Sequence, residues 1–396
     1  MTQSHGDGGR PPLATLWFSP RQTIEQVVAT RPTHLVWVLA ILGTIATIYG
    51  QIVSIGASGP FADWRFWRAL ILVGAVGGIV LVYLSALVLN WVGRLLGGQA
   101  PARALLAWSA LPNILGFLIA LIAGIALSGG NAVTAKALLV AFGLWGFIVF
   151  LLMLARVQHF GFWRTIAAYV LYLIVLLVIV VLFRTFLYQP FSIPAASMAP
   201  TLLVGDYFFA AKFAYGYSRH SLPFSPPLPS GRVLATLPER GDVVVFRSPK
   251  DTATDFVKRV VGLPGDRIQM KQGLLFINDV PVSREPLADF DAAGLCGSES
   301  SRAVRRWRET LPNGASYETL NCFENGFYDD TKVYAVPAGH LFVLGDNRDN
   351  STDSRALSAL GYVPVENLVG RASLIFFSRA EGSGEVRIER LGVVVR

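Results

Sequence analysis

Charged residues are scarce in this chain of 396 residues, at 15% of the total, whereas soluble domains carry about 25%. Hydrophobic residues make up 53%. Disordered chains and charged coiled coils need the opposite balance, so both are excluded. The shortage of charge predicts that a large part of the chain is embedded in a membrane.

Acidic residues are almost absent from positions 1–186, which contain Asp7, Glu25 and Asp63 against eleven Lys and Arg residues. The later positions are balanced, so the net charge of +8 lies in the apolar half. Positive charge beside apolar segments indicates membrane orientation and not a nucleic-acid footprint. The lipid bilayer is therefore an expected partner, and nucleic acid is not.

Cysteine is limited to Cys296 and Cys322, whose spacing fits no zinc finger, and we expect neither a metal nor a cofactor. Free buried thiols and a disulfide remain alternatives for this pair. A disulfide is permitted if the second half lies outside the cytoplasm. The five histidines fall in no triad pattern, so a Ser-His-Asp enzyme is not favoured.

Five apolar stretches are long enough to cross a bilayer, which takes about 20 residues. They lie at 34–55, 69–92, 105–127, 137–155 and 165–183. We expect residues 34–160 to form a four-helix membrane domain and residues 165–186 a fifth transmembrane helix. Residues 1–33 are polar and do not resemble a secretory signal peptide, so the chain is expected to stay anchored.

Loop charges predict the orientation of these spans. With residues 1–33 in the cytoplasm, the inner segments hold seven Lys and Arg residues and the outer flanks hold four. An odd number of crossings then places residues 187–396 on the outer side of the membrane.

Residues 187–396 predict a mainly antiparallel β domain, because short runs rich in Val, Ile and Phe alternate with turn residues. The expected strands are Val243–Phe246, Val257–Val261, Leu274–Ile277, His340–Leu344, Ala372–Phe377 and Val386–Ile388. Gly-Asp pairs at 205, 241, 265 and 345 are interpreted as turns. An insertion at about 283–335 interrupts the pattern. We interpret its basic cluster Arg302–Glu309 as a solvated helix face, with contact to anionic lipid as the alternative.

Three segments of the β domain carry residues suited to catalysis. Phe191–Leu202 follows the last apolar stretch and contains Ser197, Phe256–Asp266 contains Lys258, and Gly345–Arg355 is rich in Gly, Asp and Asn. A nucleophilic serine needs a base, and lysine can act as one only if burial lowers its pKa from about 10.4.

Alternation along a strand places Phe256, Lys258 and Val260 on one largely apolar face and Arg259 on the other. That face could desolvate the amine. A lysine at a sheet edge without a catalytic role is the alternative, and the pattern alone does not bring Ser197 to Lys258.

Taken together, the motifs S-M-x-P-T-L, K-R-x-x-G-L-P-G-D and G-D-N-R-D-N-S-x-D-S-R resemble the boxes of bacterial type I signal peptidases in order and spacing. The resemblance covers residues 175–395. It implies a membrane-bound Ser-Lys endopeptidase of the bacterial inner membrane. The mainly antiparallel β catalytic domain would lie in the periplasm and remove signal peptides from exported preproteins.

By this resemblance Ser197 is the nucleophile, Lys258 is the general base, and Ser351 orients the lysine. Structural support is expected from Asp346, Asp353 and Arg355, the last two as an ion pair. The substrate is expected to bind as an added strand. The candidate substrate-binding residues are Phe191, Ile193, Pro194, Phe256 and Val257, for which packing in the core is an equal alternative.

The chain departs from familiar relatives in two respects. Several relatives carry a hydroxyl two residues before the nucleophile, where this chain has Ala195, and they have one to three spans. Residues 15–160 resemble the Yip family, in Trp17–Pro20 and Leu111-Pro112. That resemblance implies a scaffold, for which the export translocon is a candidate partner. A processing peptidase with few clients and an inactive membrane scaffold are the alternative functions.

Overall fold

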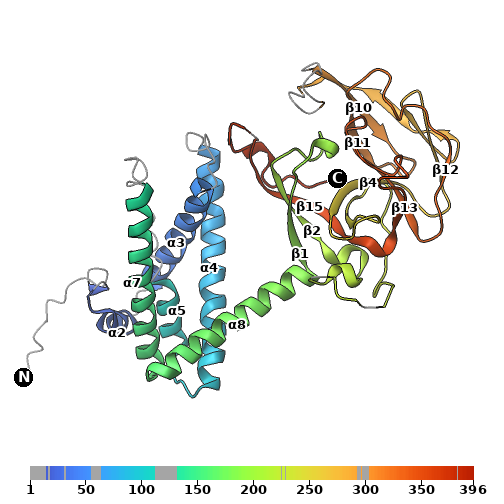
Figure 1. Cartoon of the computed structure of the whole chain (residues 1–396). Coiled ribbons are helices and arrows are strands. Elements are labelled where there is room, and N and C mark those ends of the chain that lie inside the picture. Colours follow the sequence, from blue (N-terminus) through green and yellow to red (C-terminus); the bar gives the residue numbers. More distant parts are fainter. Residues whose placement is uncertain are drawn as a thin grey trace, which may run out of the picture. The chain divides into compact units, whose positions relative to one another are not determined.

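The computed structural model describes residues 15–16, 18–30, 33–54, 64–111, 132–223, 225–227, 229–291, 296, 303–380 and 382–396. The chain divides into two compact units, the helical Met1–Ile179 and the β-rich Val180–Arg396 (Figure 1). This order of apolar helices followed by antiparallel sheets confirms the predicted fold class.

Long apolar helices make up the first unit, and the last of them continues into the second. The described helices are α2 (Pro20–Thr30), α3 (Thr33–Ser54), α4 (Trp64–Leu95), α5 (Ala102–Ala110), α7 (Ala132–Gln158) and α8 (Phe162–Phe186). Helices α3 and α4 approach closely at Gly78, where a Cβ atom would lie 2.5 Å from the carbonyl oxygen of Ala40. Trp108 of α5 anchors the core by donating from Nε1 to the carbonyl of Phe150 at 3.1 Å.

Three helical segments of the described chain are long and apolar enough to cross a membrane: Phe66–Leu95, Val140–Gln158 and Phe162–Phe186. They correspond to the predicted spans at 69–92, 137–155 and 165–183. The predicted span at 34–55 corresponds to a shorter apolar helix, His34–Tyr49. The predicted span at 105–127 falls largely outside the described residues, because 112–131 are not described.

The described part of the second unit contains three antiparallel sheets. The largest has seven strands in the order β1-β2-β15-β3-β4-β13-β14, and Figure 1 shows β1, β2 and β15 side by side. The other two have the orders β11-β10-β8, with β9 beside β10, and β12-β5-β6-β7. The strands are β1 (Tyr188–Ser192), β2 (Asp206–Ala211), β3 (Val243–Arg247), β4 (Asp255–Gly262), β5 (Arg267–Lys271), β6 (Leu274–Ile277), β7 (Val280–Pro281), β8 (Ser283–Pro286), β9 (Phe290–Asp291), β10 (Ala303–Thr310), β11 (Ser316–Asn321), β12 (Tyr334–Ala335), β13 (His340–Leu344), β14 (Val363–Pro364) and β15 (Leu368–Ser378).

The predicted helix at Arg302–Glu309 is wrong, because Ala303–Thr310 forms strand β10 between β8 and β11. Within this strand Val304 and Glu309 are buried while Arg305 and Arg308 are exposed. Because Arg305 and Arg308 are three positions apart, they project from opposite faces of the strand, and both reach solvent. The predicted insertion at 283–335 accordingly carries strands of its own rather than interrupting the β pattern.

The predicted strand at Val386–Ile388 is also wrong. Val386 makes an isolated bridge with Arg379, and the short 3-10 helix Ile388–Arg390 begins directly after Arg387. Side chains add to this single bridge, because Arg390 donates to the Asp206 carboxylate and to the carbonyl of Thr201. The segment therefore braces the loop that follows Ser197.

Three of the four Gly-Asp pairs form turns, as the sequence predicts. Gly205, Gly241 and Gly265 have φ of 85°, 95° and 92°, a region that favours glycine. The aspartate after each glycine accepts a hydrogen bond from the backbone N–H three residues earlier. These bonds are Leu203 to Asp206, Glu239 to Asp242 and Leu263 to Asp266. The fourth pair, at 345, has a different role.

Candidate active site

Strand β4 brings Lys258 to Ser197. Ser197 lies in the short 3-10 helix Ala196–Met198, which follows β1, and Lys258 lies in the middle of β4. The Lys258 Nζ lies 2.7 Å from the Ser197 Oγ and also donates to the carbonyl of Val257 at 3.0 Å. An amine and a hydroxyl at this distance can exchange a proton directly.

Burial lowers the pKa of Lys258 to about 8, even though the carboxylates of Asp353 and Asp346 act in the opposite direction. The side chain is 3% exposed. Phe256 and Val260 belong to one apolar cluster, and Nζ lies 5.6 Å from the centre of the Phe256 ring. The amine is therefore neutral in a substantial fraction of molecules just above neutral pH.

The third predicted segment holds Ser197 by its backbone. The N–H of Asn347 donates to the carbonyl of Ser197 at 3.1 Å. A Cβ atom on Gly345 would lie 2.5 Å from that same carbonyl oxygen and 2.2 Å from the Ser351 Oγ. The interpretation of this Gly-Asp pair as a simple turn is therefore wrong. Gly345 provides the space in which the loop passes against the serine.

Asp346 and Arg259 form a buried ion pair next to this contact. The Arg259 Nε and Nη2 donate to the two Asp346 oxygens at 2.8 and 2.7 Å, and both side chains are 1% exposed. Thr201 donates to the same carboxylate at 2.5 Å. Sequence reasoning missed Arg259 and Thr201. The signal was the alternation itself, since Arg259 points to the face opposite Lys258 and needs a buried acid there.

Asp353 and Arg355 form a second buried ion pair, with distances of 2.9 and 2.8 Å. Burial alone would raise the pKa of Asp353, but Arg355, the N–H of Gly345 and the Ser351 hydroxyl together outweigh this effect, so the pKa is lowered. The N–H of Gly345 donates to the same carboxylate. The ion pair thus fixes the start of the loop that reaches Ser197.

Ser351 lies over Gly345, and no hydrogen bond joins it to Lys258 among the described contacts. Its hydroxyl is near enough to the Asp353 carboxylate to help lower that pKa. It makes no hydrogen bond of good geometry within the described part of the chain. The described contacts thus include no hydrogen bond between Ser351 and Lys258, and the orienting role of Ser351 stays a prediction.

The predicted substrate-binding residues lie on both sides of the dyad. Phe191, Ile193 and Val257 pack in or against one apolar cluster, and Pro194 is exposed. Both backbone polar groups of Ile193 are hydrogen-bonded. Its N–H donates to the carbonyl of Asp206, and its carbonyl accepts from the N–H of Gly205. Among the described strands, β13 pairs with β4 only from Arg259 onward, so the preceding residues of β4 pair with β3 alone.

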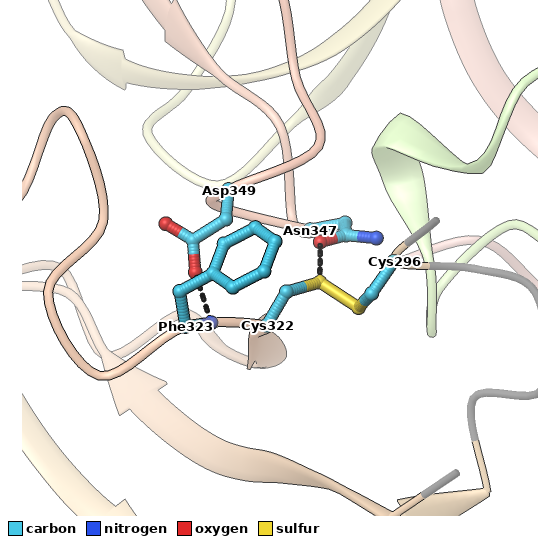
Figure 2. Close-up of a disulfide and its surroundings, with 5 residues drawn as sticks. All are labelled: Cys296, Cys322, Phe323, Asn347 and Asp349. Carbon is cyan, nitrogen blue, oxygen red and sulfur yellow. Dashed lines mark hydrogen bonds between the residues drawn. A yellow bond between two sulfur atoms is a disulfide. The ribbon is translucent and has the colours of Figure 1, made fainter. Parts of the chain in front are cut away.

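Cys296 and Cys322 are joined by a disulfide, with a Cα–Cα distance of 5.7 Å. Figure 2 shows the bridge next to Asn347 and Asp349 of the loop that contacts Ser197. Within the described ranges, no group of three His, Cys, Asp or Glu side chains is arranged to hold a metal ion.

Comparison with known proteins identifies the family. Residues 166–377 match the family described as signal peptidase, peptidase S26. The chain belongs to this family. It is therefore a serine endopeptidase, as the sequence predicts. Residues 14–184 match the Yip1 domain, which confirms the second resemblance, and the two matches share residues of α8.

Signal peptidase I of Rickettsia canadensis (strain McKiel) is 42% identical over 208 residues, which is 50% of this chain and 76% of that protein. Signal peptidase I of Rickettsia typhi (strain ATCC VR-144 / Wilmington) has the same identity and coverage. A crystal structure of a signal peptidase I from Enterococcus faecalis V583 covers 34% of this chain and 97% of its own, at 27% identity and a TM-score of 0.21. The Yip1 match and the apolar helices indicate association with a membrane.

Proposed function

We propose that this chain removes signal peptides from exported preproteins, with Ser197 as the nucleophile and Lys258 as the general base. The observation that carries the proposal is the 2.7 Å contact between the Ser197 Oγ and a buried lysine amine whose pKa is lowered to about 8. Membership in the signal peptidase family supports the substrate class.

The reaction begins when neutral Lys258 accepts the Ser197 proton and the oxygen attacks the carbonyl carbon of the scissile bond. The resulting ammonium protonates the departing amine, which leaves an acyl-enzyme. Water, activated by the same amine, then hydrolyses the ester of the acyl-enzyme. This step releases the signal peptide with a free C-terminal carboxylate and restores the serine hydroxyl. Because Ala195 offers no hydroxyl, we assign stabilisation of the oxyanion to the backbone N–H of Ser197.

The substrate is proposed to bind as an extended strand along the part of β4 that precedes Lys258, which pairs with β3 alone among the described strands. Phe256 and Val257 lie on this stretch, and Ile193 and Pro194 precede the serine. Small apolar side chains of the substrate would contact these residues.

We propose that residues 34–160 and 165–186 span the bacterial inner membrane, with residues 1–33 in the cytoplasm and 187–396 in the periplasm. The excess of Lys and Arg on the inner segments supports this orientation. The bilayer and the export translocon would then be partners. Protease digestion of spheroplasts tests this orientation, because it should degrade the β domain while leaving residues 1–33 intact.

Cleavage of a preprotein by the purified full chain tests the catalytic proposal. Ser197→Ala and Lys258→Ala should each lose processing. Lys212→Met is the matched control. Lys212 is also buried, with its pKa lowered to about 8, but it contacts Gln189 instead of the serine. Normal processing by either dyad variant would contradict the mechanism, and a wild type that cleaves no preprotein would favour a scaffold.

A further inference from the structure

The disulfide lies at the end of strand β11, where the pairing of that strand stops. The ladder between β10 and β11 runs from Thr310–Ser316 to Arg305–Asn321, so Cys322 is the first residue beyond it. Cys296 and Cys322 belong to an apolar cluster with Ala199, two residues after the nucleophile. The bridge therefore shares an apolar cluster with the segment that carries Ser197.

The same end of β11 is hydrogen-bonded to residues 346–349, the loop that contacts Ser197. Leu320 donates from its N–H to the carbonyl of Asp346 and accepts from the N–H of Arg348, both at 2.9 Å. The Cys322 Sγ lies 3.2 Å from the Asn347 Oδ1 (Figure 2). Phe323 then donates from its N–H to the Asp349 carboxylate at 3.0 Å.

The opposite side of this loop faces the catalytic serine. Asn347 donates from its N–H to the carbonyl of Ser197, and Asp346 holds Thr201 and Arg259. Residues 346–349 are therefore held between the end of β11 and the segment around Ser197. A displacement at Cys322 can therefore reach the Ser197 backbone through Asn347, whose N–H donates to the Ser197 carbonyl.

We propose that the Cys296–Cys322 disulfide positions Ser197 against Lys258 and that full peptidase activity depends on its oxidised state. This inference rests on the proposed function of the dyad. The disulfide fixes the end of β11 just beyond the last residue that pairs with β10. It thereby keeps residues 346–349 in contact with the carbonyl of Ser197. In the reduced chain that constraint is lost and the Ser197 Oγ leaves its place beside the amine.

The redox step is an ordinary exchange. A dithiol such as dithiothreitol transfers two electrons and two protons to the bridge, which yields two cysteine thiols and the cyclic disulfide of the reagent. Disulfide oxidants of an oxidising compartment carry out the reverse reaction. Cys322 is only half-buried, so a small reagent can reach it.

Kinetics of the full chain in detergent test the proposal. Oxidised protein, protein reduced with dithiothreitol, and the Cys296→Ser/Cys322→Ser variant are compared on one preprotein, with free thiols counted by a colorimetric reagent. We expect kcat to fall about tenfold in the last two, since a 1 Å misplacement can cost about 10²-fold. The KM should stay within about twofold, because the substrate edge of β4 is untouched. Reoxidation should restore kcat in the reduced protein.

Thr310→Ala is the matched control, because it weakens the same two strands at the end remote from the disulfide. It should leave kcat unchanged. Equal kcat for reduced and oxidised protein, or an equal loss in Thr310→Ala, would overturn the positioning role. Failure of the oxidised wild type to cleave, or cleavage by Ser197→Ala, would instead overturn the proposed function, so the two failures can be told apart.

Discussion

Gly345 offers a direct test of how the nucleophile is held. In Gly345→Ala the new Cβ would lie 2.5 Å from the Ser197 carbonyl oxygen, whereas ordinary contact begins at 3.4 Å. The Ser351 Oγ lies nearer still, at 2.2 Å, but it is a side-chain atom that can rotate away. The Ser197 carbonyl is backbone, so the loop or the serine must move by about 0.9 Å. A shift of this size is about a third of the 2.7 Å distance between the Lys258 Nζ and the Ser197 Oγ, enough to break that hydrogen bond. We therefore expect kcat to fall about 10²-fold.

The assay is steady-state cleavage of a preprotein together with thermal unfolding. Gly262→Ala is the control, because its Cβ would crowd Phe342 and Ile268 at 2.8 and 2.9 Å in the core, without touching Ser197. It should lower the melting temperature but leave kcat near that of wild type in the folded protein. A Gly345→Ala variant that keeps kcat within threefold of wild type would refute the claim that this contact positions the serine.

Other predictions concern the charges around the dyad. Because burial lowers the pKa of Lys258 to about 8, kcat/KM should rise with pH around 8, and a rise only near 10.5 would contradict a buried base. Unfolding restores the ordinary lysine pKa, so the free energy of unfolding should increase with pH between about 8 and 10.5. In urea titrations Lys258→Met should remove its own share of that increase and leave the share of Lys212, whose pKa is also lowered to about 8. Arg259→Met leaves the Asp346 carboxylate buried without its cation and should lower the free energy of unfolding by about 3–5 kcal/mol, measured in the same titrations. A loss below about 1 kcal/mol there would show that Thr201 alone satisfies Asp346.

Strands with buried apolar runs could be predicted from the sequence. The expected strands Leu274–Ile277 and His340–Leu344 coincide with β6 and β13. Short runs of Val, Leu and Phe are predictable because such strands are buried in the core. Arg302–Glu309 could not be predicted in this way. Its arginines obscure the alternation, and its buried Glu309 becomes possible only through the ion pair with Arg348.

The candidate site shows a similar limit. The motifs named Ser197 and Lys258, yet they are 61 positions apart, and only the fold brings their side chains together. Gly345 looked like a turn because the same Gly-Asp pair forms turns at three other places. What distinguishes it is the nearby carbonyl of Ser197, a tertiary contact that no local pattern records.

Because Lys258 and Arg259 are neighbours in the sequence, the register of β4 determines which of the two side chains lies beside Ser197. Successive side chains of a strand face opposite ways, so one points to the serine and the other to the acid that steadies the serine's loop. A slip of one residue that placed Arg259 where Lys258 stands would leave Val260 facing the acid. A guanidinium would then stand beside the hydroxyl, and it stays protonated throughout the physiological range. A molecule with this register would be inactive even if it were compact and soluble in detergent, because it would lack a base beside the serine.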